Sequence, residues 1–308
     1  MAHAAIDIGS NTLRLLIAEP ATGAPWHTLF YTHRICRLGE GLHHSGRLGE
    51  AGMARTLAAL GDFARFCADH GVGPAQIHAV ATAAMREAEN GRDFCRSIRA
   101  ETGIEVRVID GNHEAQTALA GSLAVLDAAT RQDMLLFDIG GGSTEFTRAS
   151  DGKMIDGISR KLGVVRLVEA HLRSDPPTAA EFEAMVAASD AHLIEVERHW
   201  PDGRRPQFLV GTAGTVTTLA ATAQNLLPYS AAAINNYAMT RSEFAALRDR
   251  LLAMRHAERE KLPTIEAGRA DLILAGLAII EAIFRRWDYA ALITVDAGLL
   301  EGVWLDHI

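Results

Sequence analysis

One short pattern occurs twice in this sequence, and it constrains the fold more than any other feature. An apolar run leads into Asp-Ile-Gly and a small polar turn at residues 4–12, and the same design returns at residues 135–144. The two aspartates, Asp7 and Asp138, are 131 positions apart. Between and beyond these copies, β-rich runs alternate with helical stretches, which is typical of an α/β fold. Because self-similarity at a fixed spacing indicates repeated structural units, we predict an α/β protein built from two duplicated domains.

The bulk properties favour an ordinary folded protein and exclude several classes. A chain of 308 residues is long enough for two domains that each bury a core. The three cysteines are widely spaced, so we expect a reducing compartment, and residues 1–3 lead directly into an apolar strand without a signal-peptide pattern. No apolar run approaches the ~20 residues of a bilayer span. We therefore expect a cytoplasmic protein without a membrane segment.

The net charge limits the partners that the chain can bind. A formal charge of −8 gives no global positive field and argues against nucleic acid as a partner. It does not exclude a polyanionic substrate, because a local arginine, backbone N–H groups or a bridging divalent cation can hold phosphate on an acidic protein.

Three turns rich in glycine and hydroxyl residues are candidate phosphate sites. Glycine lets backbone N–H groups approach an anion closely, and a helix N-terminus adds further donors. For either of the first two turns alone, a plain hairpin turn is an equal alternative, and for the third turn the alternative is close packing of a strand against a helix. Taken together, phosphate binding is the better interpretation. The candidate residues are Gly9, Ser10, Asn11 and Thr12, then Gly140, Gly141, Gly142, Ser143 and Thr144, and finally Gly214 and Thr215.

Carboxylates accompany both copies of the pattern. Asp7 and Asp138 end apolar strands, where a half-buried carboxylate is costly without a partner. Glu145 directly follows the second turn. Hard divalent cations suit such groups, whereas an Asx-type turn is the alternative for the aspartates, especially for Asp7. The spacing leaves open which of the three contacts a metal ion.

Three further residues are candidates with open alternatives. Glu114 lies in the first turn of a predicted helix, where an acid that complements the helix dipole is the more common case and a general base is the functional one. Arg86 could bind phosphate oxygens with its guanidinium group or could be a solvated surface arginine. Arg14 alternates with leucines on a predicted strand, so we expect it on the face opposite to them.

These residues belong to a collinear series of motifs across nearly the whole chain. The series resembles the exopolyphosphatase / guanosine pentaphosphate phosphatase (Ppx/GppA) family of the actin, Hsp70 and sugar-kinase superfold. The matching stretches are residues 5–12, 37–42, 82–90, 111–115, 138–145, 161–167, 211–215, 269–271 and 296–302.

The resemblance implies a fold, an activity and roles for named residues. The fold would be two actin-like (ribonuclease H-like) domains with an interdomain cleft, formed by residues 1–123 with 296–308 and by residues 124–295. The activity would be Mg²⁺-assisted hydrolysis of the terminal phosphate of linear inorganic polyphosphate. Glu114 would be the catalytic base, and Asp138 and Glu145 would act on metal and water. A homodimer is also implied.

Two departures and several alternatives remain at this point. The family often has a second acid before the base, whereas this chain has His113, and many members have arginine in the last motif, where this chain has Leu300. Within hydrolases, removal of the 5′ terminal phosphate of guanosine pentaphosphate is the alternative substrate choice. A phosphotransferase between polyphosphate and a nucleotide, and a nucleotide-binding sensor without turnover, are alternatives from other classes.

Overall fold

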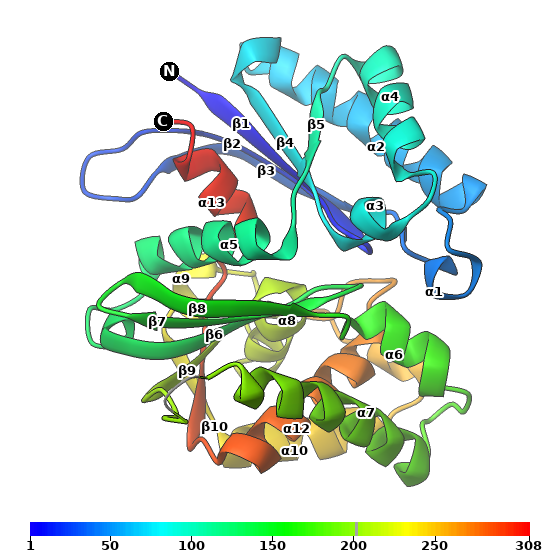
Figure 1. Cartoon of the computed structure of the whole chain (residues 1–308), viewed down its shortest axis with the longest axis vertical. Coiled ribbons are helices and arrows are strands. Elements are labelled where there is room, and N and C mark those ends of the chain that lie inside the picture. Colours follow the sequence, from blue (N-terminus) through cyan, green and yellow to red (C-terminus); the bar gives the residue numbers. More distant parts are fainter. Residues whose placement is uncertain (201–202) are drawn as a thin grey trace. The chain divides into compact units, whose positions relative to one another are not determined.

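The computed structural model describes residues 1–200 and 203–308, which form two compact units. Unit 1 contains Met1–Ala124 and Ala297–Ile308, and unit 2 contains Val125–Asp296. In Figure 1, unit 1 carries the blue and cyan elements together with the red C-terminal helix, so both ends of the chain belong to the same unit.

Unit 1 is a five-stranded sheet in the order β3-β2-β1-β4-β5, with helices on both faces. β1 is antiparallel to β2, β2 is antiparallel to β3, and β1, β4 and β5 are parallel. The strands are β1 (His3–Ile8), β2 (Thr12–Glu19), β3 (His27–Ile35), β4 (Ile77–Ala81) and β5 (Val106–Val108). The helices are α1 (Leu42–Ser45), α2 (Glu50–Asp69), α3 (Ala83–Glu87), α4 (Gly91–Thr102), α5 (Gly111–Val125) and α13 (Leu299–Leu305), with a 3₁₀ turn at Pro74–Gln76.

Unit 2 is a six-stranded sheet in the order β10-β11-β9-β6-β7-β8. Its strands are β6 (Asp133–Ile139), β7 (Thr144–Ser150), β8 (Lys153–Arg160), β9 (Phe208–Thr212), β10 (Tyr237–Thr240) and β11 (Ala291–Thr294). Its helices are α6 (Val164–His171), α7 (Ala179–Arg198), α8 (Ala213–Ala223), α9 (Ala231–Ile234), α10 (Arg241–Ala253), α11 (His256–Arg259) and α12 (Leu272–Trp287), with a 3₁₀ turn at Thr130–Gln132.

The two sheets repeat one topology. The order β8-β7-β6-β9-β11 matches β3-β2-β1-β4-β5, and each adjacent pair has the same sense in both sheets. Unit 2 adds only β10, which lies antiparallel to β11 at the edge. The predicted duplication is therefore present in three dimensions, and the chain has the expected α/β class with two actin-like domains.

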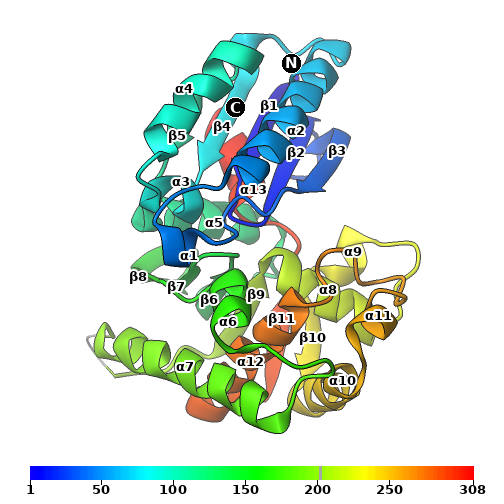
Figure 2. The same ribbon diagram turned by 90° about the vertical axis from the view of Figure 1, so that its right-hand side faces the viewer.

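Each unit buries its own apolar core. In unit 1, α2 and α4 cover one face of the sheet (Figure 2). Phe63 of α2 is fully buried in the core on this face. On the other face the fully buried Trp304 of α13 donates its indole N–H to the carbonyl oxygens of His3 and Ala18, each at 3.2 Å. In unit 2, α12 is buried along almost its whole length, as its apolar sequence predicts. None of the helices in residues 1–200 and 203–308 has the length and apolarity of a membrane span.

Two helices of unit 2 begin with capping boxes. The Thr178 hydroxyl accepts a hydrogen bond from the Glu181 backbone N–H, and the Glu181 carboxylate accepts one from the Thr178 N–H in return. These contacts, led by the backbone N–H of Thr178, lower the pKa of Glu181 to about 2. Thr240 and Glu243 start α10 in the same way.

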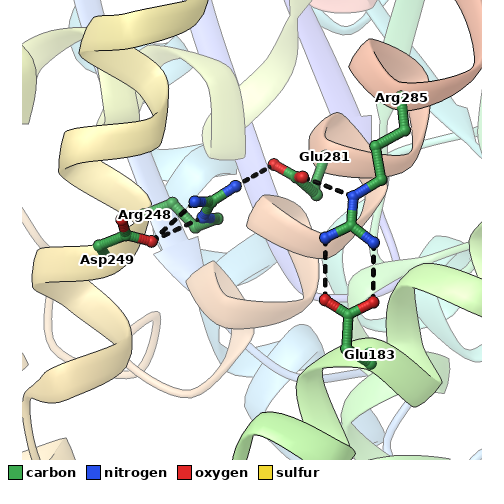
Figure 3. A network of polar contacts seen from close by, with 5 residues as sticks. All are labelled: Glu183, Arg248, Asp249, Glu281 and Arg285. Atoms are coloured by element: carbon green, nitrogen blue, oxygen red, sulfur yellow. Dashed lines mark hydrogen bonds and ion pairs between the residues drawn. The ribbon is translucent and has the colours of Figure 1, made fainter.

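A chain of ion pairs joins the helices of unit 2 (Figure 3). The buried carboxylate of Glu281 on α12 accepts hydrogen bonds from Arg248 of α10 at 2.5 Å and from Arg285 at 2.6 Å. Arg285 then makes a two-pronged contact with Glu183 of α7, at 2.7 and 2.8 Å. This carboxylate is thus matched by two guanidinium groups, and the network ties α7, α10 and α12 together.

Candidate functional site

The first loop connects β1 to β2 and is held from one side by the segment 36–39. The Asn11 carbonyl oxygen accepts hydrogen bonds from the N–H groups of Cys36 and Arg37, both at 2.9 Å, and the Ser10 carbonyl oxygen accepts one from Gly39 at 2.7 Å. At Gly9, a Cβ atom would lie 2.9 Å from the Thr12 carbonyl oxygen, so the turn requires glycine there. These two carbonyl oxygens are occupied by the segment, and the Gly9 N–H donates to the Thr12 carbonyl oxygen at 3.1 Å, so the remaining N–H groups and the hydroxyls are the loop's means of binding an anion.

Asp7, at the end of β1, pairs with Arg14 across the β1–β2 ladder. The two residues are direct cross-strand partners, and Arg14 contacts Asp7 Oδ2 with Nη2 at 2.8 Å and Nε at 3.1 Å. Burial raises the pKa of Asp7, and the charge and hydrogen bond of Arg14 oppose that rise. Asp7 Oδ1 is buried without a hydrogen-bond partner among the described residues. Arg14, a predicted phosphate ligand, is therefore placed against a carboxylate.

The predicted base and the second predicted arginine lie together beyond the ends of β4 and β5. Arg86 Nη1 donates hydrogen bonds to Glu114 Oε2 at 3.0 Å and to the Ile109 carbonyl oxygen at 2.8 Å. Glu114 is 7% exposed. The Thr82 N–H donates to the Ile8 carbonyl oxygen at 3.3 Å, which brings the start of α3 to the end of β1. Arg86 therefore contacts Glu114 at the same edge of the sheet as the first loop.

Asp110, which the sequence did not single out, begins the helix that carries Glu114. Its carboxylate accepts the His113 N–H at 2.8 Å and its carbonyl oxygen accepts the Glu114 N–H at 2.9 Å. The His113 N–H is also the main reason why the pKa of Asp110 is lowered. The His113 ring lies 2.9 Å from Arg107 Nη2. The helix start is thereby fixed by a side-chain cap.

The second loop connects β6 to β7 and is held by the start of α6. The carbonyl oxygens of Gly140 and Gly141 accept the N–H groups of Val164 and Val165, at 3.1 and 2.9 Å. The Gly142 carbonyl oxygen accepts a hydrogen bond from Arg166 Nε at 2.8 Å. As in the first loop, the carbonyl oxygens accept hydrogen bonds from one neighbouring segment.

Two members of the second loop differ in their surroundings from a simple phosphate turn. Ser143 and Thr144 are both buried, and the Thr144 hydroxyl donates to the Leu162 carbonyl oxygen. This contact fixes the segment before α6 against the loop. Thr144 could therefore offer phosphate only its backbone N–H, not the hydroxyl that we expected.

Four polar side chains form one row across the sheet of unit 2. Asp138 of β6 faces Glu145 of β7, Glu145 faces Ser159 of β8, and on the other side Asp138 pairs with Thr212 of β9. Ser159 Oγ donates to Glu145 Oε1 at 2.6 Å. We call these four residues the polar row. Thr212 lies in the stretch 211–215 singled out from the sequence, whereas Ser159 was not singled out.

The carboxylate pair within the polar row fits a hard cation. Asp138 is 9% and Glu145 2% exposed, and like charges directly opposite each other in neighbouring strands are unfavourable. Within residues 1–200 and 203–308, no group of three or more histidine, cysteine, aspartate or glutamate side chains is arranged to hold a metal ion. Two carboxylates nevertheless match Mg²⁺, which is usually bound through one or two of them together with water and substrate phosphate oxygens.

The third turn joins β9 to α8 beside the polar row. Ala213 has φ 71°, in the left-handed region that non-glycine residues rarely adopt. Gly214 follows in the first turn of α8, and Thr215 is buried against Gly276 of α12, where a Cβ atom would come within 2.2 Å of the Thr215 methyl group. Gly214 and Thr215 thus lie at the start of an eleven-residue helix, at the carboxyl end of a strand next to β6.

The structure brings the predicted residues together in two groups, one in each unit. In unit 1 the first loop, Arg14, Arg86 and Glu114 lie at the carboxyl ends of β1 and β4. In unit 2 the second loop, the carboxylate pair and the third turn lie at the carboxyl ends of β6 and β9. This is the edge at which α/β sheets carry their ligands.

The chain matches known proteins over nearly its whole length. The model of the Ppx/GppA phosphatase family matches residues 16–308. Exopolyphosphatase 2 of Mycobacterium tuberculosis is 34% identical over 299 residues, which cover 92% of this chain and 89% of that protein. The crystal structure of an exopolyphosphatase from Cytophaga hutchinsonii superposes with a TM-score of 0.91 at 27% identity, covering 100% of this chain and 99% of the other. That of the Aquifex aeolicus Ppx/GppA phosphatase, in its type II variant, gives 0.78 at 30% identity and covers 100% and 99%.

The fold, the loops and these relatives define the chain as a phosphoanhydride-hydrolysing enzyme of the actin-like fold. It belongs to the Ppx/GppA phosphatase family.

Proposed function

We propose that this chain is an exopolyphosphatase, which hydrolyses the terminal phosphate of linear inorganic polyphosphate with the assistance of Mg²⁺. The single observation that carries this choice of substrate is the 34% identity with exopolyphosphatase 2 of Mycobacterium tuberculosis over 92% of the chain. The site is compatible with such a substrate, because glycine-rich loops offer N–H donors and a carboxylate pair offers a place for a cation that neutralises phosphate charge.

Glu114 is the general base of the proposed reaction. It is buried, it lies at the start of a capped helix, and Arg86 binds one of its two oxygens. The guanidinium group stabilises the ionised carboxylate, which is the form that accepts a proton from an attacking water. Arg86, predicted as a direct phosphate ligand, is better supported as the residue that orients Glu114.

Asp138 and Glu145 would hold the cation, whose contribution is to offset negative charge on the phosphate oxygens. The loops would bind the phosphate groups through Gly9, Ser10, Asn11 and Thr12, through Gly140, Gly141, Gly142 and Ser143, and through Gly214 and Thr215. Because little covalent chemistry falls to the protein in phosphoryl transfer, positioning and electrostatics supply most of the rate.

Three further elements belong to the proposal. The two compact units would be the functional domains, with boundaries close to residues 123 and 295. The resemblance to the family supports a homodimer, and the spread-out cysteines support a cytoplasmic location.

Orthophosphate release from polyphosphate and from guanosine pentaphosphate, measured side by side with Mg²⁺, tests the proposal. We expect faster release from polyphosphate, and loss of release in Glu114→Ala with polyphosphate binding retained. A clear preference for the nucleotide would replace exopolyphosphatase by guanosine pentaphosphate 5′-phosphohydrolase. Formation of nucleoside triphosphate from the diphosphate and polyphosphate would instead indicate a phosphotransferase.

A further inference from the structure

A hydroxyl group on the edge strand of unit 2 lies beside the proposed cation-binding carboxylates. Ser159 of β8 donates the 2.6 Å hydrogen bond to Glu145 Oε1 described above, and the two residues face each other across the antiparallel β7–β8 ladder. An O–H···O⁻ contact of this length is typical of a strong, charge-assisted hydrogen bond. Of the four residues in the polar row, Ser159 is the one on the edge strand of the sheet.

The position of Ser159 depends on an irregularity in the ladder. The hairpin turn consists of Asp151 and Gly152, with φ of 49° and 71°, and is closed by the pair Ser150 and Lys153. If this register continued along the strands, Glu145 would face Ile158. The ladder instead shifts between Arg148 and Ala149, so that β8 contains one extra residue and Glu145 faces Ser159.

The extra residue is Ile155, which has no partner in the ladder and is 57% exposed. A one-residue change of register turns every side chain to the other face of a sheet. With the bulge, Ile158 faces the buried Phe146 and packs against the apolar core, while Ser159 reaches Glu145. Without it, an isoleucine would lie beside the carboxylates and the serine would face the core. The bulge therefore lets Ile158 face the core while Ser159 faces the polar row. Bulges near active sites commonly redirect a side chain in this way.

The contact has a clear chemical consequence for Glu145. A hydrogen bond to one carboxylate oxygen restrains the rotation of the whole group, and it thereby sets the directions in which the carboxylate lone pairs can meet a cation or an attacking water. Outer groups that orient metal ligands in this way typically contribute 10- to 100-fold to metal affinity or activity.

We propose that Ser159 is a positioning residue that orients the Glu145 carboxylate for cation binding, and that the β8 bulge exists to bring its hydroxyl to that carboxylate. The inference rests on the proposed role of Glu145 at the cation.

Three variants test it. Ser159→Ala removes the hydroxyl, and Ser159→Thr keeps it. Ser150→Ala is the matched control, because Ser150 lies in the same hairpin and its hydroxyl donates to the Gln132 carbonyl oxygen, at 3.0 Å, away from the polar row. The measurements are Mn²⁺ affinity by calorimetry without substrate, phosphate release against Mg²⁺ concentration, and Tm.

We expect Ser159→Ala to weaken Mn²⁺ binding and to raise the half-activating Mg²⁺ concentration by about 10- to 100-fold. KM for polyphosphate at saturating Mg²⁺ should change much less, and Ser159→Thr should recover most of the loss. Ser150→Ala should match the wild type in cation affinity. A Tm for Ser159→Ala close to that of Ser150→Ala would separate this effect from misfolding.

Equal Mn²⁺ affinity in Ser159→Ala and Ser150→Ala would overturn the inference, whatever the substrate of the enzyme. If the wild type released phosphate from neither substrate, the proposed function would fail, but the affinities measured without substrate would still decide the role of Ser159. Absence of Mn²⁺ binding by the wild type would also count against it, because Glu145 would then have no cation to meet.

Discussion

The first loop and the second loop share one backbone arrangement but differ in the charges of their facing side chains. In both, an aspartate near the end of the first strand faces a residue seven positions later on the antiparallel second strand. In unit 1 that pair is Asp7 and Arg14, and the two side chains make a 2.8 Å ion pair. In unit 2 it is Asp138 and Glu145, two buried carboxylates. The same backbone therefore carries a charge-balanced pair in one copy and a like-charged pair in the other.

The difference concerns the charge that lies next to the aspartate in each copy. The Asp7 carboxylate already has a guanidinium partner, so its charge is matched within the protein. Two adjacent buried carboxylates are stabilised by a positive charge or a shared proton, and a divalent cation is one partner that phosphate chemistry can supply. Under the proposed function, the first loop would hold phosphate and the second would bind a cation together with the phosphate.

The largest expected effect comes from removing one member of the like-charged pair. Glu145→Gln should lower kcat for phosphate release by about 100- to 1000-fold, because a group acting on charge in the transition state is lost. The fold should lose little stability, because one of two adjacent like charges is removed, which offsets the weaker hydrogen bond from Ser159. Phosphate release and urea unfolding on the same preparation check both points. Unfolding at markedly lower urea would show that Glu145 is held by favourable charge contacts instead.

The equivalent change in unit 1 should act mainly on stability. Arg14→Met leaves the Asp7 carboxylate buried without its ion-pair partner, which should cost about 3 kcal/mol at neutral pH. The loss should shrink as the pH falls, because protonated Asp7 no longer needs the arginine. Urea unfolding at pH 7 and pH 4.5 measures it, with Arg14→Lys as the charge-retaining control. An Arg14→Met protein as stable as the wild type at both pH values would contradict a self-sufficient pair.

A buried carboxylate outside both loops tests whether burial alone makes kcat sensitive to the loss of a charged group. Glu281 lies between Arg248 and Arg285 in the network of Figure 3, and its charge is matched twice. Glu281→Gln should lower the free energy of unfolding by about 1–3 kcal/mol, since two hydrogen bonds to charged groups are weakened, while kcat stays unchanged. Phosphate release and urea unfolding separate the two. A large loss of kcat would mean that activity responds to any disturbance of unit 2.

The smallest effect concerns pH and should be confined to unit 1. The His78 ring of β4 lies between two other imidazoles, with the His307 centroid at 3.8 Å and His3 Nδ1 within 3.1 Å of His78 Nε2. Burial, then the charges of His307 and His3, lower the pKa of His78 to about 4 from 6.5. The unfolded chain therefore binds more protons between these values, so this contribution to stability is complete above pH 6.5 and is lost as the pH falls toward 4.

His78→Phe keeps a stacked ring without the titrating group. The wild type should lose more Tm than this variant between pH 7 and pH 4.5, and hydrogen exchange should locate the difference at β1, β4 and α13. Equal losses of Tm in the wild type and in His78→Phe would show that the histidine stack does not make the stability of the fold sensitive to acid.

Much of the fold follows from local sequence patterns. Apolar runs and capping residues predict β1, β4, α2 and the starts of α7 and α10 within a few residues, and the repeat around Asp7 and Asp138 predicts the duplication. The sequence pattern does not reveal β3, from His27 to Ile35, because all of its side chains are exposed or half-buried and the run carries little periodicity.

The site was less accessible to sequence reasoning, because it depends on pairing between strands. The loops and carboxylates could be found from residue types alone, but the ion pairs of Arg14 with Asp7 and of Arg86 with Glu114 require strand register and loop closure. Ser159 was missed for the same reason. Counting from the Asp151–Gly152 turn places Ile158 opposite Glu145, and only the bulge at Ile155 brings the serine there.

Mn²⁺ binding to the substrate-free protein tests the asymmetry of the two loops most directly. Calorimetry should be carried out on the wild type, on Asp138→Asn and on Asp7→Asn, which change the same position in the two copies. We predict that the wild type binds the cation, that Asp138→Asn binds it at least about 10-fold more weakly, and that Asp7→Asn retains wild-type affinity. Loss of binding in Asp7→Asn with full binding in Asp138→Asn would assign the cation to the first loop and contradict the account.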